Sequence, residues 1–243
     1  MTEIRWTVSH STNLLAFLQH LPTCRGMNLL RIHAFALALM SVTPLSAEEL
    51  PPDASSLPTM RWGGTETQQK WNEDALAALR EHGQVLPRTV PKDIDGWCAF
   101  YREADVFTRE AFWIGFLSAL SKHESTYNQT AVGGGAQWYG LVQISPGTAR
   151  GYGCRARSGQ ALKDGGDNLS CAIRIMSVTV PRDNVIAQRD IRWRGVAADW
   201  APLTKTKKRQ DMANWLQAQP YCTASIMPEK PKPKKRKFNS SKR

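Results

Sequence analysis

The chain has 243 residues, of which 42% are hydrophobic and 22% charged, and its formal net charge is +11. This length supports one domain with a sizeable core plus appendages, and it leaves little room for a second such domain. Residues 229–243 contain eight Lys or Arg and one Glu, a net +7. The rest of the chain is therefore close to neutral, and the basic tail suits nucleic acid or any anionic surface, including membranes and cell-wall polymers.

A signal peptide is expected near the start of the chain. Met27 opens a short positively charged segment, residues 34–40 are apolar, and Ser46 and Ala47 precede two glutamates. That order predicts cleavage after Ala47 and a periplasmic or secreted protein. The apolar run is about half of the roughly 20 residues that span a bilayer, so a removed signal is favoured over a signal anchor. Residues 1–26 fit neither a signal nor a folded element, so translation is expected to begin at Met27.

The next segment combines a linker with a short helix. The prolines and serines of residues 51–58 favour an irregular linker. Leu76 and Leu79 give residues 71–81 an amphipathic helical pattern, and Gly83 marks its end.

The strongest helical pattern ends at a carboxylate. Thr108 is a suitable N-cap for this helix. Apolar residues then recur at spacings of three and four, which predicts a broadly buried helix through Phe112, Trp113, Phe116, Leu117 and Leu120. The pattern ends near His123 and Glu124, so a core helix is expected to deliver a carboxylate at its end.

A glycine-rich region follows, and two more helices come after it. Between residues 132 and 153 glycines alternate with aromatic residues, which predicts a loop or small hairpin, and loops on a rigid scaffold often carry sites. Asp167 is a suitable cap for a helix whose apolar face is Leu169, Ala172, Ile173 and Met176. A last helix is expected over residues 209–219. No internal repeat is present, and few segments alternate as strands do.

These patterns divide the chain into four parts. Residues 1–47 are the N-terminal extension and signal, and residues 48–89 are the linker and short helix. Residues 90–224 are predicted to form one mainly α domain. Residues 225–243, rich in lysine with several prolines and almost no apolar residues, are predicted to be a disordered basic tail that suits an anionic envelope surface.

Four cysteines lie after the predicted cleavage site: Cys98, Cys154, Cys171 and Cys222. An even number in an exported protein favours two disulfides, with three possible connectivities. We expect Cys154 with Cys171 and Cys98 with Cys222, and four inert buried thiols are the alternative. The spacings lack the close Cys-x-x-Cys pairs of zinc sites, so no metal is expected, and no organic cofactor is implied.

Four segments occur in an order typical of a known family. They are KHESTYN at residues 122–128, YGLVQISPGTA at 139–149, Leu162 with DNL at 167–169, and AADW at 197–200. Together they resemble the soluble lytic transglycosylase family, whose SLT domain belongs to the lysozyme-like superfamily. The resemblance covers about residues 110–203.

The resemblance implies a mainly α, lysozyme-like domain that cleaves the β-1,4 bond between N-acetylmuramic acid (MurNAc) and N-acetylglucosamine (GlcNAc) of peptidoglycan strands. Glu124 matches the family's single acid/base, which protonates the leaving oxygen. Its carboxylate then acts as base while the MurNAc 6-hydroxyl attacks the anomeric carbon, giving a 1,6-anhydro product. Ser125 matches a residue that supports the site, Gln143 one that contacts substrate, and Asn168 one that shapes the cleft.

Physical chemistry points to Glu124 independently. A general acid must be protonated near neutral pH, and burial against apolar groups raises a carboxyl pKa to about 6 in well-studied glycosidases. Most glycosidases also need a second carboxylate, and no aspartate of this chain lies in a segment that marks it as that partner. An attacking hydroxyl within the substrate removes that need.

The remaining candidates each have a structural alternative. Ser125 also suits a backbone cap, Gln143 a loop support, and Asn168 a helix start. The rings of Trp138 and Tyr139 suit either stacking on sugars or core packing, and His123 suits a helix end.

Two departures from the family pattern bear on the cleft. Asp199 and Trp200 stand where the family often has Tyr-Asn, and that Tyr normally reaches the catalytic carboxylate. Trp200 is then expected either to stack on substrate or to belong to a rebuilt subsite. The triple glycine at residues 133–135 also lengthens the loop between Glu124 and Gln143.

Three functions fit these observations. The first is a lytic transglycosylase, and the second is a muramidase of the same fold that uses water and one of the aspartates. The third is a catalytically weak glycan-binding or assembly protein, in which the basic tail recruits part of an envelope machine. The basic tail is the only feature that would support a nucleic-acid binder. The sequence gives no signal for an oligomeric state, nor for whether cleavage is internal or from chain ends.

Overall fold

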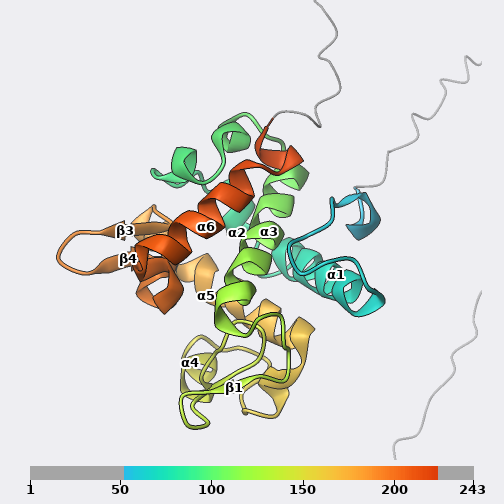
Figure 1. Cartoon of the computed structure of the whole chain (residues 1–243), viewed down its shortest axis with the longest axis vertical. Helices are drawn as coiled ribbons and strands as arrows, with labels where there is room; N and C mark the ends of the chain where they lie inside the picture. Colours follow the sequence, from blue (N-terminus) through green and yellow to red (C-terminus); the bar gives the residue numbers. More distant parts are fainter. Residues whose placement is uncertain (1–51, 224–243) are drawn as a thin grey trace, which may run out of the picture. The chain divides into compact units, whose positions relative to one another are not determined.

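The computed structural model describes residues 52–223 and shows a mainly helical fold with two small hairpins (Figure 1). The predicted signal peptide with its cleavage site and the predicted basic tail lie outside these residues. None of the helices within residues 52–223 is both long and apolar enough to cross a membrane.

Helix α1, Glu66–Arg80, begins earlier than its apolar pattern predicts. The Gln68 side chain accepts a hydrogen bond from the Thr65 backbone N–H at 2.9 Å, which satisfies a free donor at the helix start. The buried face includes Trp71 and Leu79, and α1 packs against helix α5. These residues belong to the same hydrophobic core as the rest of the described chain, so the compact unit extends upstream of the predicted boundary at residue 90.

Helix α3, Val106–Glu124, is the central helix of the fold. Its side chains from Glu110 to Ser121 are all buried, as expected for a helix that is apolar around most of its circumference. Short helix α2, Val85–Arg88, and helix α6, Thr206–Gln217, pack against it, and Figure 1 shows α6 running along α3. Asp105 is the cap, because its carboxylate accepts a hydrogen bond from the Thr108 N–H at 2.7 Å, so the predicted cap Thr108 was wrong.

Helix α5, Gly165–Asp183, corrects a second predicted cap in the same way. The Asp164 carboxylate accepts a hydrogen bond from the Asp167 N–H at 2.9 Å, so Asp164 is the cap and Asp167 lies in the first turn. Asn184 ends the helix in the left-handed region at φ 54°.

The glycine-rich region forms the small hairpin that its composition predicts. Strands β1, Val132–Gly133, and β2, Trp138–Tyr139, pair antiparallel, and short helix α4, Pro146–Gly151, follows them. A second hairpin, which the sequence did not predict, pairs β3, Ala187–Arg189, with β4, Trp193–Gly195.

Single turns of 3-10 helix complete the described chain: η1 Ala54–Ser56, η2 Ile94–Gly96, η3 Ala99–Arg102, η4 Ala161–Lys163, η5 Val196–Ala198, η6 Ala201–Thr204 and η7 Pro220–Cys222. Two disulfides join the pairs that the sequence predicted. Cys98 is bonded to Cys222, 124 positions away, and Cys154 is bonded to Cys171, 17 positions away.

Candidate active site

Glu124 is the last residue of α3 and lies at the edge of the core, partly buried. Burial raises its pKa to about 7, because a charged carboxylate loses hydration when apolar groups surround it. The positive charge of Lys208 on α6 acts in the opposite direction and favours the ionised form. A carboxyl group with a pKa near neutrality both donates and accepts a proton at physiological pH.

The chain turns sharply after Glu124. Thr126 and Tyr127 both have positive φ, 54° and 63°, a conformation that non-glycine residues rarely adopt. Ser125 ends α3, and both its N–H and its hydroxyl donate to the Ser121 carbonyl, at 3.0 and 3.4 Å. The serine beside Glu124 therefore shapes the end of the helix in this structure.

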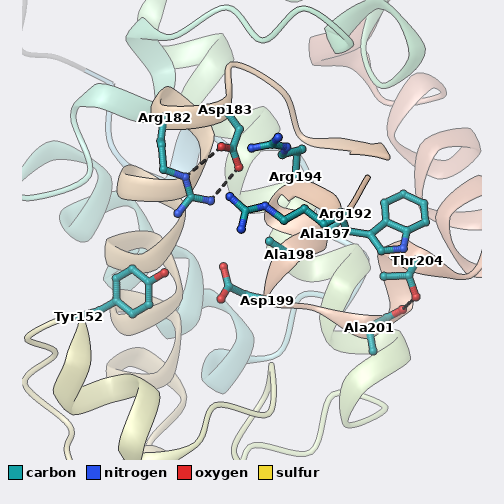
Figure 2. Close-up of a pocket in the computed structure, with 11 residues that line it drawn as sticks. Tyr152, Arg182, Asp183, Arg192, Arg194, Ala197, Ala198, Asp199, Ala201 and Thr204 are labelled. Carbon is teal, nitrogen blue, oxygen red and sulfur yellow. Dashed lines mark hydrogen bonds and ion pairs between the residues drawn. The ribbon is translucent and has the colours of Figure 1, made fainter. Parts of the chain in front are cut away.

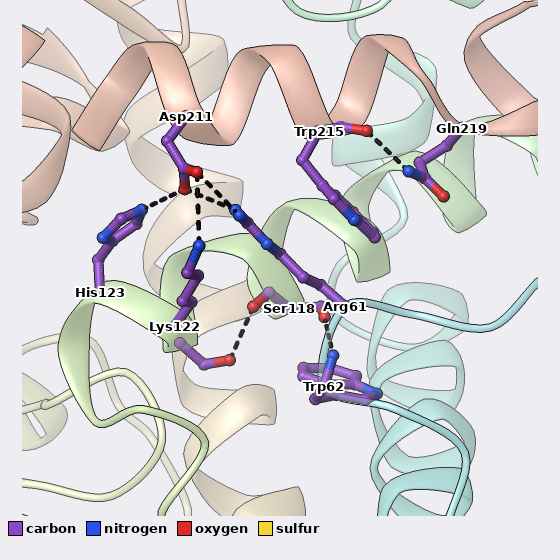
Figure 3. A network of polar contacts seen from close by, with 9 residues as sticks. Arg61, Trp62, Ser118, Lys122, His123, Asp211, Trp215 and Gln219 are labelled. Carbon is purple, nitrogen blue, oxygen red and sulfur yellow. Dashed lines mark hydrogen bonds and ion pairs between the residues drawn. The ribbon is translucent and has the colours of Figure 1, made fainter. Parts of the chain in front are cut away.

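A polar network centred on Asp211 holds the last turn of α3 against α6 (Figure 3). The Asp211 carboxylate accepts two hydrogen bonds from the Arg61 guanidinium, at 2.8 and 2.9 Å, and lies 2.7 Å from His123 Nε2. Lys122 Nζ lies 3.4 Å from the same carboxylate. The Arg61 contact holds the pKa of Asp211 well below its usual range. His123 is thus engaged next to Glu124 as a helix-end group.

Asn168 fastens the glycine-rich loop to α5. Its side chain is fully buried, and its amide nitrogen donates to the carbonyls of Tyr139 and Leu162 at 2.9 and 3.0 Å. Its oxygen accepts from the Val142 N–H at 2.9 Å. Gly140 makes this approach possible, because a Cβ there would lie 2.1 Å from the Leu162 carbonyl oxygen.

Gln143 and Trp200 make further hydrogen bonds to the glycine-rich region. Gln143 has a φ of 51°, and its amide donates to the carbonyls of Gly140 and Ala131 at 2.9 and 3.3 Å. Trp200 is 4% exposed, and its indole N–H donates to the Val142 carbonyl at 2.8 Å. Trp200 is therefore buried and bonded to the loop, and Gln143, which lies within the loop, is partly exposed.

The two aromatic residues of β2 differ in exposure. Trp138 is 44% exposed, and its ring packs where a Cβ of Gly134 would lie. Tyr139 is half-buried, and its hydroxyl donates to the Ala136 carbonyl at 2.8 Å. Of the two rings, Trp138 therefore offers the larger free face for a sugar.

Backbone hydrogen bonds connect these parts to the end of α3. The Asn128 N–H donates to the Ser125 carbonyl, the Ala131 N–H to the Asn128 carbonyl, and the Gly140 N–H to the Ala131 carbonyl. The predicted residues of the loop are thus assembled around residues 139–143, which are tied step by step to the turn after Glu124.

Sequence reasoning missed Lys208 and Asp211. Both lie on α6, and neither belongs to a segment that resembles the family. Only the packing of α6 along α3 brings their charges to the end of α3, so no local pattern could have identified them.

Comparison with known proteins agrees with this architecture. Residues 107–187 match the family described as the transglycosylase SLT domain. None of the curated proteins is significantly similar to the chain.

Solved structures of one protein, Bd0314 DslA, are similar to this chain. Its wild type, form 2, has a TM-score of 0.62 and 27% identity, over 68% of this chain and 98% of that chain. Two variants of it, each with one Glu replaced by Gln, have TM-scores of 0.59 and 28% identity, over 65% of this chain and 93% of theirs. The match at residues 107–187 identifies an SLT domain within the chain, and its mainly helical fold is consistent with the lysozyme-like SLT fold.

Proposed function

We propose that this protein is a peptidoglycan lytic transglycosylase that uses Glu124 as its single acid/base. The observation that carries the proposal is the position of Glu124, partly buried at the end of an apolar helix, where desolvation raises its pKa to about 7. The SLT domain match supports peptidoglycan as the substrate class.

The reaction has two proton transfers on one carboxyl group. Protonated Glu124 donates its proton to the glycosidic oxygen as the bond from MurNAc C1 to that oxygen breaks, and GlcNAc leaves with a free 4-hydroxyl. The resulting carboxylate takes the proton of the MurNAc 6-hydroxyl while O6 bonds to C1. The product carries a 1,6-anhydro ring, Glu124 is protonated again, and no water is consumed.

In the described part of the chain, the pKa shift of Glu124 arises from burial and one cation, without a second carboxylate. In retaining two-carboxylate glycosidases the groups are about 5 to 5.5 Å apart, and a like charge within about 4 to 6 Å raises a carboxyl pKa. Among residues 52–223, the side-chain charge that acts on Glu124 is the cation of Lys208, and no acidic residue contributes to its shift. This supports attack by a hydroxyl of the substrate itself.

The other predicted site residues divide by exposure. Asn168 and Trp200 are buried and would position the loop at residues 139–143, while Ser125 would set the end of α3. Trp138 has the exposure that stacking on a sugar ring requires. Two disulfides fit a protein that works in an oxidising compartment outside the cytoplasm, where peptidoglycan lies.

Mass spectrometry of digested peptidoglycan tests the proposal. The purified protein is expected to release anhydro-muropeptides, and Glu124→Gln to release none. Glu81→Gln, at the exposed end of α1, is the matched control and should keep full activity. Reducing-end muropeptides would show a water-using muramidase instead. A lack of soluble product from the wild type would favour a binding or assembly role.

A further inference from the structure

A large cavity lies where the end of α5, strand β4 and residues 197–204 meet. Its volume is about 780 Å³, which is in the range of pockets that bind small molecules. Its charged and hydroxyl side chains include Tyr152, Arg182, Asp183, Arg192, Arg194 and Asp199.

Some of these charged side chains already form hydrogen-bonded ion pairs with neighbouring residues. Arg182 donates two hydrogen bonds to Asp183, at 2.9 and 2.8 Å, and the Gly195 N–H donates to the same carboxylate at 2.7 Å. Arg194 donates to Asp190 at 2.9 Å. The pairing with Arg182 lowers the pKa of Asp183 to about 2. These groups have little capacity left for a ligand.

Three other polar groups of the cavity are unpaired in the part of the chain that the structure describes. Within residues 52–223, no hydrogen-bond or ion-pair partner is found for the Arg192 guanidinium, the Asp199 carboxylate or the Tyr152 hydroxyl. Figure 2 shows all three directed toward the same space. Desolvation raises the pKa of Asp199, and the positive charge of Arg182 acts on it in the opposite direction. A cation, an anion and a hydroxyl are thus available together in one cavity.

The cavity shares a chain segment with the candidate active site. Asp199 immediately precedes Trp200, whose indole holds the Val142 carbonyl of the site loop. Thr204 lines the cavity, and the next helix, α6, carries Lys208, whose charge acts on Glu124. Residues 199–208 thus connect the cavity to the candidate active site.

We infer that this cavity binds the peptide stem of peptidoglycan, with a stem carboxylate on Arg192 and a stem ammonium or amide N–H on Asp199. The inference rests on the proposed function, because the stem is attached to the MurNAc residue that Glu124 would process. Stem peptides carry both carboxylates and N–H donors, which matches the two free charges. A guanidinium binds a carboxylate through two parallel hydrogen bonds, which gives Arg192 its selectivity.

Binding is measured on the full chain carrying Glu124→Gln, so that cleavage does not interfere. Isothermal titration calorimetry compares glycan strands that retain their stems with strands of equal length from which an amidase has removed them. We expect about tenfold tighter binding of the stem-bearing strands, as a charge-assisted bidentate contact provides. Adding Arg192→Gln should remove the preference. Arg88→Gln, which removes the same charge from an exposed position on α2, should keep it.

Chemical modification of the stem separates the two contacts. Amidation of stem carboxylates should weaken binding when Arg192 is present and have no further effect after Arg192→Gln. Acetylation of stem amines should likewise lose its effect in Asp199→Asn. Thermal unfolding of each variant, followed by circular dichroism, should show an unchanged midpoint, since both groups lack partners within residues 52–223.

Equal affinity for stem-bearing and stem-free strands would overturn the inference, and so would a preference that survives Arg192→Gln. The proposed function fails separately, because it requires product release by the protein with Glu124 intact. Cleavage without stem preference would contradict only the stem site, and stem preference without cleavage would contradict only the transglycosylase.

Discussion

At the scale of single residues, burial and the charge of Lys208 act on the pKa of Glu124 in opposite directions. Burial favours the protonated acid, and the lysine charge favours the carboxylate. The proposed reaction needs both forms in turn, the first to cleave the glycosidic bond and the second to activate the 6-hydroxyl. A pKa of about 7 keeps both forms accessible at neutral pH.

Lys208→Gln tests this balance. Loss of the cation should raise the pKa of Glu124, so the decline of kcat/KM on the alkaline side should move to higher pH. We expect a move of less than about one pH unit, because Lys208 is exposed and solvent screens its charge. Rates of product release between pH 5 and 9 at low salt measure it. Lys207→Gln, one residue away on the exposed surface of α6, should leave the profile in place, and an unmoved profile in Lys208→Gln would contradict the balance.

Glu124 should also make stability depend on pH. Its pKa is raised from 4.5 in the unfolded chain to about 7 in the fold, so its contribution is fully present below pH 4.5 and declines as pH rises through 7. Glu124→Gln cannot ionise and escapes this decline. We expect the variant to be more stable than the wild type at pH 8, by on the order of 1 to 2 kcal/mol, and to lack that advantage at pH 4.

Urea unfolding at the two pH values measures this difference. The Glu81→Gln control, which changes an exposed carboxylate at the end of α1, should show no such pH-dependent gain. A Glu124→Gln variant that is equally destabilised at both pH values would argue that the carboxylate is not desolvated in the fold.

At the scale of elements, the loop at residues 139–143 depends on one glycine. Gly140 has a φ of 83°, and a Cβ there would lie 2.1 Å from the Leu162 carbonyl oxygen and 2.3 Å from Asn168 Nδ2. Gly140→Ala should therefore displace the loop from Asn168 and destabilise the fold by about 2 to 4 kcal/mol.

Thermal unfolding and product release should both report this loss. Gly151→Ala, in α4, is the matched control, because no heavy atom lies within 4 Å of its added methyl group and its φ is not positive. That variant should be as stable as the wild type or slightly more so. Unaltered unfolding of Gly140→Ala would show that Asn168 does not fix the loop.

At the scale of the whole molecule, the two disulfides restrict the unfolded chain to different extents. Cys98 and Cys222 are 124 positions apart, whereas Cys154 and Cys171 are 17 apart. Loop-closure entropy predicts a loss of about 4 to 5 kcal/mol when the first bond is removed and about 3 kcal/mol for the second. Pairwise Cys→Ala variants, unfolded in denaturant, should rank in that order, and the reverse order would contradict this entropic account.

Much of the fold was accessible from the sequence because hydrophobic periodicity is a local signal. The helix ending at Glu124 and the glycine-rich hairpin were predicted correctly. Both predicted caps, Thr108 and Asp167, were wrong by three positions: each is the residue whose N–H bonds to the true cap, Asp105 or Asp164. Two residues of suitable type lay one turn apart, and propensity alone does not choose between them.

The parts that sequence could not supply depend on distant contacts. Strands β3 and β4 have three residues each, too few to establish an alternating pattern. The role of α1 in the core became visible only through its packing on α5. Glu124 was identifiable from its helix and its neighbours, but Asp211 and Lys208 act on that helix end across more than eighty positions of sequence.

The bond between Cys98 and Cys222 also determines what a protease cut would produce. It encloses α3, both hairpins, α5 and α6 in one covalent ring. The turn between β3 and β4, where Ile191 is 96% exposed, offers a protease an accessible site within that ring. After one cut there, the two fragments would migrate as a single band on a gel until a reductant opens the bond, and Glu124 would remain linked to the helix that carries Lys208.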